Sequence, residues 1–292
     1  MTVLRAIAAV ALVAGLGACS GTPPEPADPV RAQAEQVARF AFDRQRYDLA
    51  ARLYARALER AYQRDDLPAI RDIGAAEALA LLRADRPEEA LAAARQIAAE
   101  LGRRATPVPA RLTLVQAQGH YQTDDLDAAD RAARRVHQTA RSAPLRARAH
   151  FILGLVAADR GDLAGLRRAH AAIAAATAPA LRADRAVLAG RIAAAERDSH
   201  RAHRAYLSAA ELRQDVKDEL GMAQALADAA AHAPQNATAA DLYLRAGRTA
   251  DLLGRADEAQ LWLCTALKKG SAGDDVALQA RNRLGVRTCE DD

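Results

Sequence analysis

The sequence predicts an all-α fold in which antiparallel helix pairs stack side by side. Its 292 residues are 51% apolar but only 3% aromatic, so the core must consist mostly of Ala and Leu. Ala and Leu are the strongest helix formers, and Arg and Glu follow closely. Small and large apolar residues also recur at helical spacing, and short turn signals separate the runs. These three features favour helices along most of the chain.

The first 30 residues differ from the rest in composition. Residues 1–5 carry one positive side chain, and residues 6–16 form an unbroken apolar run. This run is too short to cross a bilayer, which requires about 20 apolar residues, but it has the length of the hydrophobic region of a secretory signal. Four prolines and a glycine then fall within residues 20–30. Proline excludes a helix there and favours a semi-rigid tether roughly 30 Å long.

Residues 16–19, Leu-Gly-Ala-Cys, resemble the lipobox of bacterial lipoproteins, in which a small pair precedes a cysteine. The resemblance covers the first 20 residues. It implies cleavage before Cys19 and acylation of that cysteine with fatty acids such as palmitate, and several acyl chains together anchor a protein durably. Ser20 at the next position implies, by the sorting rule of that family, the periplasmic face of the outer membrane. The alternative is an ordinary secretory signal that happens to contain a cysteine.

Helix–turn–helix patterns follow one another from residue 31 to residue 270. In the first, Tyr47, Ala50 and Tyr54 mark the second helix, and in the last, Gly247 and Ala259 would let two helices approach closely. Acidic residues, Gly or Pro mark the breaks between helices. The breaks are at residues 65–68, 85–87, 107–109, 124–125, 142–144, 161, 179 and 254, an additional helix is expected at 218–232, and a helix at 274–284 should cap the stack.

This order of small and large residues resembles the tetratricopeptide repeat, a helix–turn–helix unit of roughly 34 residues. The resemblance implies an α-solenoid with an open concave groove, built mainly by the first helix of each pair. The repeats are somewhat longer than the usual period, and a generic Ala-rich helical bundle is the alternative. The position aligned with the small residue of each second helix is Ala50, Ala90, Ala129, Leu166, Ala202 and Ala259, of which Leu166 departs from the family pattern.

The predicted organisation is therefore a signal peptide over residues 1–18, a Pro-rich tether over 19–30, a helical solenoid over 31–270, and a cap helix with a tail over 271–292. If Cys19 is acylated, two thiols remain in an oxidising compartment, Cys264 and Cys289. The final helix should fold back antiparallel, so we expect a disulfide between these two cysteines. The alternative is one buried thiol and one free thiol in a frayed tail.

Charge and motifs argue against several classes of function. The formal charge is only +4 and both signs are interspersed, which is typical of a solvated surface and not of a nucleic-acid-binding protein. The sequence lacks the common nucleophile, phosphate-binding and zinc-protease motifs. His200 and His203 lie three residues apart without an evident third ligand, so we expect no metal, no cofactor and no enzymatic activity.

The resemblance to tetratricopeptide repeats also implies which positions face the groove. Arg and aromatic residues there are the types that dominate protein interfaces, although they could equally belong to the core or to the solvated surface. We therefore expect a lipid-anchored scaffold that binds other cell-envelope proteins in assembly or cell-wall maintenance. The alternatives are a cell-wall enzyme with an unfamiliar active site and, more weakly, a solute-capturing lipoprotein. The expected groove residues are Arg39, Phe42, Gln118, Tyr121, Arg148, Phe151, Arg191, Arg245 and Arg248.

Overall fold

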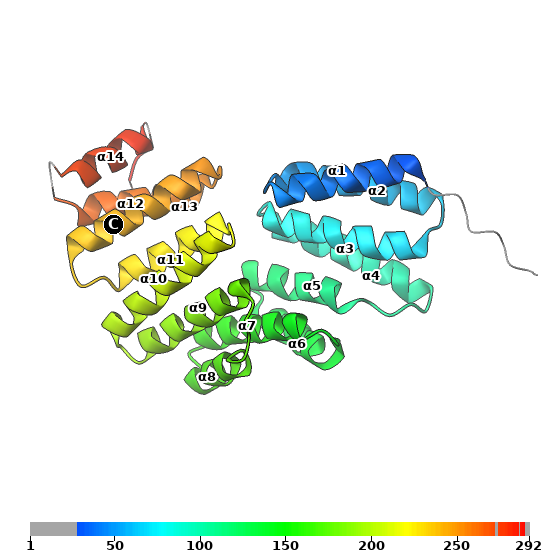
Figure 1. The fold of residues 1–292 in the computed structure, drawn as a ribbon, viewed down its shortest axis with the longest axis horizontal. Helices are drawn as coiled ribbons and strands as arrows, with labels where there is room; N and C mark the ends of the chain where they lie inside the picture. Colours follow the sequence, from blue (N-terminus) through cyan, green and yellow to red (C-terminus); the bar gives the residue numbers. More distant parts are fainter. Residues whose placement is uncertain (1–27, 272–273, 286, 290–292) are drawn as a thin grey trace, which may run out of the picture.

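The computed structural model describes residues 28–271, 274–285 and 287–289, and this part of the chain folds into fourteen helices without a strand (Figure 1). The predicted all-α class is confirmed. The expectations for the signal peptide, for Cys19 and for the tether up to residue 27 lie outside the described residues. The helices are α1 (Pro29–Asp43), α2 (Tyr47–Gln63), α3 (Leu67–Arg83), α4 (Pro87–Arg103), α5 (Ala110–Gln122), α6 (Leu126–Thr139), α7 (Ala143–Asp159), α8 (Leu163–Ala172), α9 (Pro179–Ala195), α10 (Ser199–Asp215), α11 (Glu219–Ala231), α12 (Asn236–Leu252), α13 (Ala256–Lys269) and α14 (Asp275–Leu284).

The first helix begins earlier than the sequence suggested. The tether was expected to reach residue 30, but α1 starts at Pro29. Proline is tolerated at the first helical position because that position needs no amide donor. Asp28 precedes it and accepts hydrogen bonds from the backbone amides of Val30 and Arg31 at 3.0 and 3.1 Å. A side-chain cap of this kind fixes the start of the helix.

A tight turn recurs between successive helices. One residue adopts a positive φ, and the amide of the next bonds to a carbonyl near the end of the preceding helix, as in a Schellman motif. At the α2–α3 turn, Asp65 has φ 53°, the Asp66 amide bonds to the Ala61 carbonyl at 3.0 Å, and the Asp66 side chain caps the Ala69 amide. Similar turns occur at residues 45–46, 85–86, 124–125, 161–162, 197–198, 217–218 and 254–255. In each of them the first of the two residues has the positive φ.

The helices pack as pairs in which small residues allow close approach. Gly247 on α12 lies against Leu263 on α13, and a Cβ at Gly247 would fall 2.7 Å from the Leu263 Cγ. Gly190 on α9 stands in the same relation to Tyr206 on α10. The pairs are α1 with α2, α3 with α4, α5 with α6, α7 with α8, α9 with α10, and α12 with α13, while α11 is a single helix between α10 and α12.

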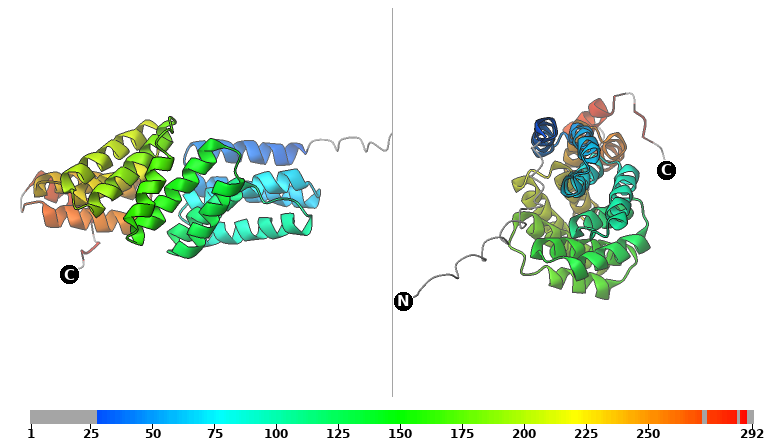
Figure 2. Two further views of the ribbon diagram at one scale, coloured as in Figure 1. Left: turned by 90° about the horizontal axis from the view of Figure 1, so that it is seen from below. Right: turned by 90° about the vertical axis from the view of Figure 1, so that its right-hand side faces the viewer.

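The stack bends so that its two ends meet. Figure 2 shows the middle of the chain, α5–α9, lying between the α1 end and the α14 end. The turns after α1 and α3 face the turns before α11 and α13 (Figure 1). Two interactions cross between them: Gln45 Nε2 donates to the Lys217 carbonyl at 2.7 Å, and Arg255 Nη1 lies 2.8 Å from Asp85 Oδ2. We call these two interactions the closing contacts.

The closing contacts correct the expectation of an open groove. Local spacing defines each helix pair, but the bend that accumulates over many pairs brings distant turns together. A cavity of about 130 Å³ remains where the two ends meet. Its lining residues come from both ends of the stack and are Gln45, Tyr47, Asp48, Arg83, Ala84, Asp218, Leu220, Leu253 and Arg255.

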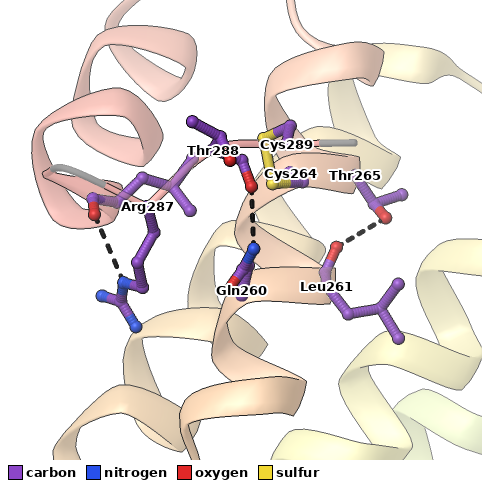
Figure 3. The surroundings of a disulfide bond; sticks show 8 residues. Gln260, Leu261, Cys264, Thr265, Arg287, Thr288 and Cys289 are labelled. Carbon is purple, nitrogen blue, oxygen red and sulfur yellow. Dashed lines mark hydrogen bonds between the residues drawn. A yellow bond between two sulfur atoms is a disulfide. The ribbon is translucent and has the colours of Figure 1, made fainter. Parts of the chain in front are cut away.

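The C-terminal segment folds back onto α13, as expected. Cys264 on α13 and Cys289 in the tail are joined in a disulfide, with their Cα atoms 5.5 Å apart (Figure 3). Gln260 Nε2 also donates to the Thr288 carbonyl at 2.7 Å. Arg287 Nη2 donates to Asp251 Oδ1 on α12 at 2.9 Å. The tail and α14 therefore cover the last pair of the stack.

Candidate functional site

The face made by the first helices of the pairs is the candidate site. Helices α3, α5, α7 and α9 contact one another in succession, so their side chains form one continuous surface. Near the middle of this surface, charged side chains come from α3, α7, α9 and α10. Further polar groups come from α5 and α11. Such a surface needs compensating charges, because taking an ion out of water costs several kcal/mol unless it is paired.

A buried ion cluster lies at the centre of this face. Asp184 on α9 is fully buried, and Arg213 on α10 is 9% exposed. Arg213 Nη2 donates to Asp184 Oδ1 at 2.5 Å, and its Nη1 donates to Asp218 Oδ2 at 2.7 Å. Asp218 also caps α11 through the Gly221 amide at 3.2 Å. Arg213 thus joins α9 to the turn that begins α11 and sets the position of that turn at the closing contacts.

Hydrogen bonding within this ion cluster is incomplete. Asp184 Oδ2 and Arg213 Nε are buried and have no hydrogen-bond partner among the described residues. Burial raises the pKa of Asp184, although the positive charges of Arg213 and Arg148 act in the opposite direction. A carboxylate with one unoccupied oxygen can accept one more donor from a neighbouring side chain, a water molecule or a bound molecule.

Two arginines beside the cluster lack ion pairs in the described part of the chain. They are Arg83 at the end of α3 and Arg148 on α7, both half-buried. Burial lowers the pKa of Arg148, Asp184 opposes this effect, and the charges of Arg83 and Arg213 add to it. Arg83 also lines the cavity at the closing contacts. Two arginines without an ion pair among the described residues therefore lie where α3 and α7 approach the turn between α10 and α11.

A second polar cluster occupies the same face on α5, α7, α9 and α11. The Tyr121 hydroxyl donates to Asp159 Oδ2 at 2.7 Å, and Arg191 Nη1 donates to Asp159 Oδ1 at 2.7 Å. Burial, followed by the bond to Asp159, raises the pKa of Tyr121 far above its usual value. Burial also raises the pKa of Asp228 on α11, and Arg191 opposes this. These contacts bring three successive first helices and α11 together around one arginine.

The structure brings some of the expected groove residues together and separates others. Tyr121 and Arg191 share Asp159, Arg148 lies near Asp184, and Phe151 packs against the core cluster around Leu166 and Leu188. Gln118 is half-buried on α5.

The remaining expected groove residues lie on helices near the two ends of the stack. Arg39 pairs with Glu35 on α1, and Phe42 packs edge-on against Tyr47 with ring centroids 5.1 Å apart. Arg245 and Arg248 are exposed on α12, and Arg248 Nη1 lies 3.4 Å from Gln279 Oε1 of α14. No contact joins these four residues to the central clusters within the described part of the chain.

Sequence reasoning missed the charged residues that organise the centre: Arg83, Asp159, Asp184, Arg213 and Asp228. For Asp184 a signal was present, because it lies three residues after Leu181 and four before Leu188, on the buried stripe of α9. An acidic residue on such a stripe needs a cationic partner, since burial of a lone carboxylate is costly. For Arg83, which ends its helix, the local sequence offers no comparable signal.

The described residues offer no arrangement for metal chemistry: no group of three or more His, Cys, Asp or Glu side chains among them could hold an ion. His200 is exposed, and His203 Nδ1 is 2.8 Å from the Ala229 carbonyl. His203 therefore contributes to the contact between α10 and α11. None of the described helices has the length and apolar character needed to cross a membrane.

Comparison with known proteins bears on the fold. No protein-family model matches the sequence, and no curated protein matches it. The apo form of RapI aligns with 82% of this chain and 70% of its own, at 11% identity and a TM-score of 0.50. A tetratricopeptide repeat protein from Parabacteroides merdae aligns with 88% of this chain and 100% of its own, at 11% identity and a TM-score of 0.49.

A third solved structure is the C-terminal part of a repeat protein of the same type from Cytophaga hutchinsonii. It covers 84% of this chain and 98% of its own, at 13% identity and a TM-score of 0.43. At such identities the likeness concerns the fold alone. The alignment with RapI, taken with the helix pairs and the close contacts at Gly190 and Gly247, supports an all-α solenoid of helix pairs for the described part of the chain, which is the architecture that the resemblance to tetratricopeptide repeats implies.

Proposed function

We propose that this protein is a lipid-anchored scaffold of the bacterial envelope that binds an acidic segment of another envelope protein on its first-helix face. The observation that carries the binding proposal is the pair of half-buried arginines, Arg83 and Arg148, which lack ion pairs among the described residues. A carboxylate from a partner would supply the missing charge. Arginine binds carboxylates through two parallel hydrogen bonds, and such bonds are about twice as strong as neutral ones.

The surroundings of these arginines favour a peptide segment over a small solute. The face continues from Arg83 through Tyr121 and Arg148 to Arg191, across four successive pairs of the stack. An extended or helical segment can contact several pairs at once, and its acidic side chains would meet positive charge near the centre. Aromatic and Arg side chains in such positions are the types that contribute most to binding energy.

The envelope location is supported by the N-terminal pattern. The apolar run at residues 6–16, the small pair before Cys19 and the Pro-rich segment after it match a lipoprotein signal and a tether. Acylation at Cys19 would hold the stack near one leaflet, because multiple acyl chains give durable anchoring where one chain gives weak binding. In this arrangement the scaffold faces the periplasm from the outer membrane.

Charge reversal tests the binding face. We expect Arg148→Glu to reduce capture of native neighbours at least tenfold in cross-linking followed by mass spectrometry in the native host. Arg204→Glu makes the same change at an exposed position of α10 and serves as the matched control. Both variants should keep wild-type helicity by circular dichroism. Capture that is unchanged in Arg148→Glu would contradict the proposed face. An Arg245→Glu/Arg248→Glu variant then tests whether binding extends to α12.

Metabolic labelling tests the anchor. Cells given an alkyne analogue of palmitate should label the wild-type protein, and Cys19→Ala should lose the label and the membrane association together. A Cys289→Ala variant controls for acylation of another cysteine. An unlabelled wild-type protein that fractionates away from membranes would reject the lipid anchor, while leaving the binding face to be judged by the cross-linking experiment.

A further inference from the structure

A second polar site lies between the second helices of the first two pairs, away from the candidate site. It is a groove of about 280 Å³ lined by residues of α2, α3 and α4. Leu58 and Ile97 are buried in its walls, and Ala55 and Ala93 are half-buried. Glu77 is the lining residue that α3 supplies. The groove thus has aliphatic walls and a carboxylate at its base.

Glu77 has no counter-charge in this position. It is half-buried, and no described residue forms an ion pair or a hydrogen bond with its carboxylate. Burial alone raises its pKa from 4.5 to about 7. A buried carboxylate without a partner is unusual, because an unpaired charge is expensive to desolvate. The other carboxyl group lining the groove, Glu59, is exposed on α2 and adds negative charge.

Two further polar groups line the same groove. The Tyr62 hydroxyl is buried and has no hydrogen-bond partner among the described residues, although the Gln96 side chain lies beside it. Tyr62 is also within electrostatic range of Glu100 and Arg103 on α4, but Glu100 already pairs with Arg103 and Arg104. The groove therefore combines an unpaired carboxylate, Glu77, with a buried hydroxyl, Tyr62, that no described group bonds.

We propose that this groove binds the cationic side chain, arginine or lysine, of a partner protein. The methylene groups would lie along Ala55, Ala93 and Leu58, and the charged head would meet the Glu77 carboxylate. Long basic side chains commonly combine an apolar stem with a charged tip in this way. The proposal goes beyond the binding of an acidic segment on the first-helix face, and either site can fail without the other.

Methyl NMR with side-chain analogues tests this site. In the full chain with labelled Ala and Ile methyl groups, n-butylguanidinium should produce saturable shifts at Ala55, Ala93 and Ile97. The uncharged isostere n-butylurea should produce none. We expect Glu77→Gln to weaken guanidinium binding at least tenfold. Glu211→Gln, which removes the same charge from an exposed site on α10, should bind as the wild type does.

The pH dependence provides an independent check. Glu77 must be ionised to bind a cation, so guanidinium binding should weaken as the pH is lowered from 8 to 5.5. Of the other titratable groups that line the groove, Glu59 is exposed, and burial raises the pKa of Tyr62, which stays neutral over this range. Equal shifts with n-butylurea, equal binding by Glu77→Gln, or binding that is independent of pH would each overturn the site.

A peptide distinguishes a protein-borne cation from a free amine. The capped tripeptide Ac-Ala-Arg-Ala-NH2 should shift the same methyl groups at least as effectively as n-butylguanidinium does. A groove that accepts the small guanidinium but excludes the tripeptide would overturn the assignment to a partner side chain.

Discussion

Two carboxylates in this protein show how environment decides the cost of a buried charge. Asp184 is fully buried but bonds to Arg213, and Arg148 lies within electrostatic range. Glu77 is less buried, yet no cation compensates it. A salt bridge offsets part of the desolvation cost, and removing one partner typically destabilises a protein by about 3–5 kcal/mol. Glu77 has no such partner, so burial raises its pKa and the folded protein binds a proton there more readily than the unfolded chain does.

Glu77 should make stability fall as the pH rises. Its pKa is 4.5 in the unfolded chain and about 7 in the folded one, so the folded state binds more protons between these values. The destabilisation is absent below pH 4.5 and complete above pH 7. We expect Glu77→Gln to be more stable than the wild type by roughly 1–3 kcal/mol at pH 8 and equal to it at pH 4. Urea unfolding at both pH values measures this, and a pH-independent difference would contradict the assignment.

At the level of helices, the local sequence determines most of what the structure shows. Acidic turn residues such as Asp66 and Asp125 cap the helices that follow them, because an adjacent side-chain oxygen satisfies a free amide. This interaction spans three residues and is readable from sequence. Leu166 departs from the small-residue pattern of the family, yet it is buried, and α8 forms as a shorter helix. The larger residue is accommodated in the core that α8 forms with α7 and α9.

Contacts between distant segments could not be predicted in the same way. Gln45 and Lys217 are 172 residues apart, and neither position carries a local signal for their contact. The groove at Glu77 combines residues of three helices, and no described residue supplies a counter-charge for that carboxylate. The groove residues expected at Arg39 and Arg248 followed family geometry, but the central charged clusters depend on how this stack bends.

Two glycines offer a matched test of close helix packing. At Gly247 a Cβ would lie 2.7 Å from Leu263 Cγ and 3.1 Å from the Leu263 backbone nitrogen, so Gly247→Ala should destabilise the protein by about 1–3 kcal/mol. At Gly102, inside α4, nothing lies within 4 Å of an added Cβ, so Gly102→Ala should stabilise it by roughly 0.5–1 kcal/mol. Thermal unfolding of both variants checks the signs, and two changes of the same sign would contradict the packing.

The disulfide should stabilise the last helices selectively. It closes a loop of 25 residues, which corresponds to about 3 kcal/mol by chain entropy. In a repeat stack each unit depends mainly on its neighbours. In Cys289→Ser, hydrogen exchange should therefore accelerate in α14 and the end of α13, while α1–α9 keep wild-type protection. Peptide mapping without reduction must first show the bond in the wild-type protein. Unchanged exchange in α14 would mean that the bond does not hold this segment.

For the molecule as a whole, the closing contacts decide how far the first-helix face is enclosed. Arg255 is mostly buried where it meets Asp85. Among the described residues, the only direct polar links between the two ends are the Asp85–Arg255 ion pair and the Gln45–Lys217 hydrogen bond. Ion pairs near a surface contribute about 0–1 kcal/mol and weaken with salt. The direct polar contacts between the ends therefore contribute a small free energy, and a partner segment could enter the face if the ends separate.

Asp85→Arg should favour the open arrangement, because it places two arginines opposite each other. Small-angle X-ray scattering at low salt should give a larger radius of gyration for this variant than for the wild type, and Asp85→Arg/Arg255→Asp should reverse much of the increase. Asp241→Arg, at an exposed position of α12 outside the closing contacts, makes the same charge change and should leave the radius unaltered. If all four proteins scatter alike, the bend is fixed by the helix stack itself, and access to the first-helix face does not depend on the turns.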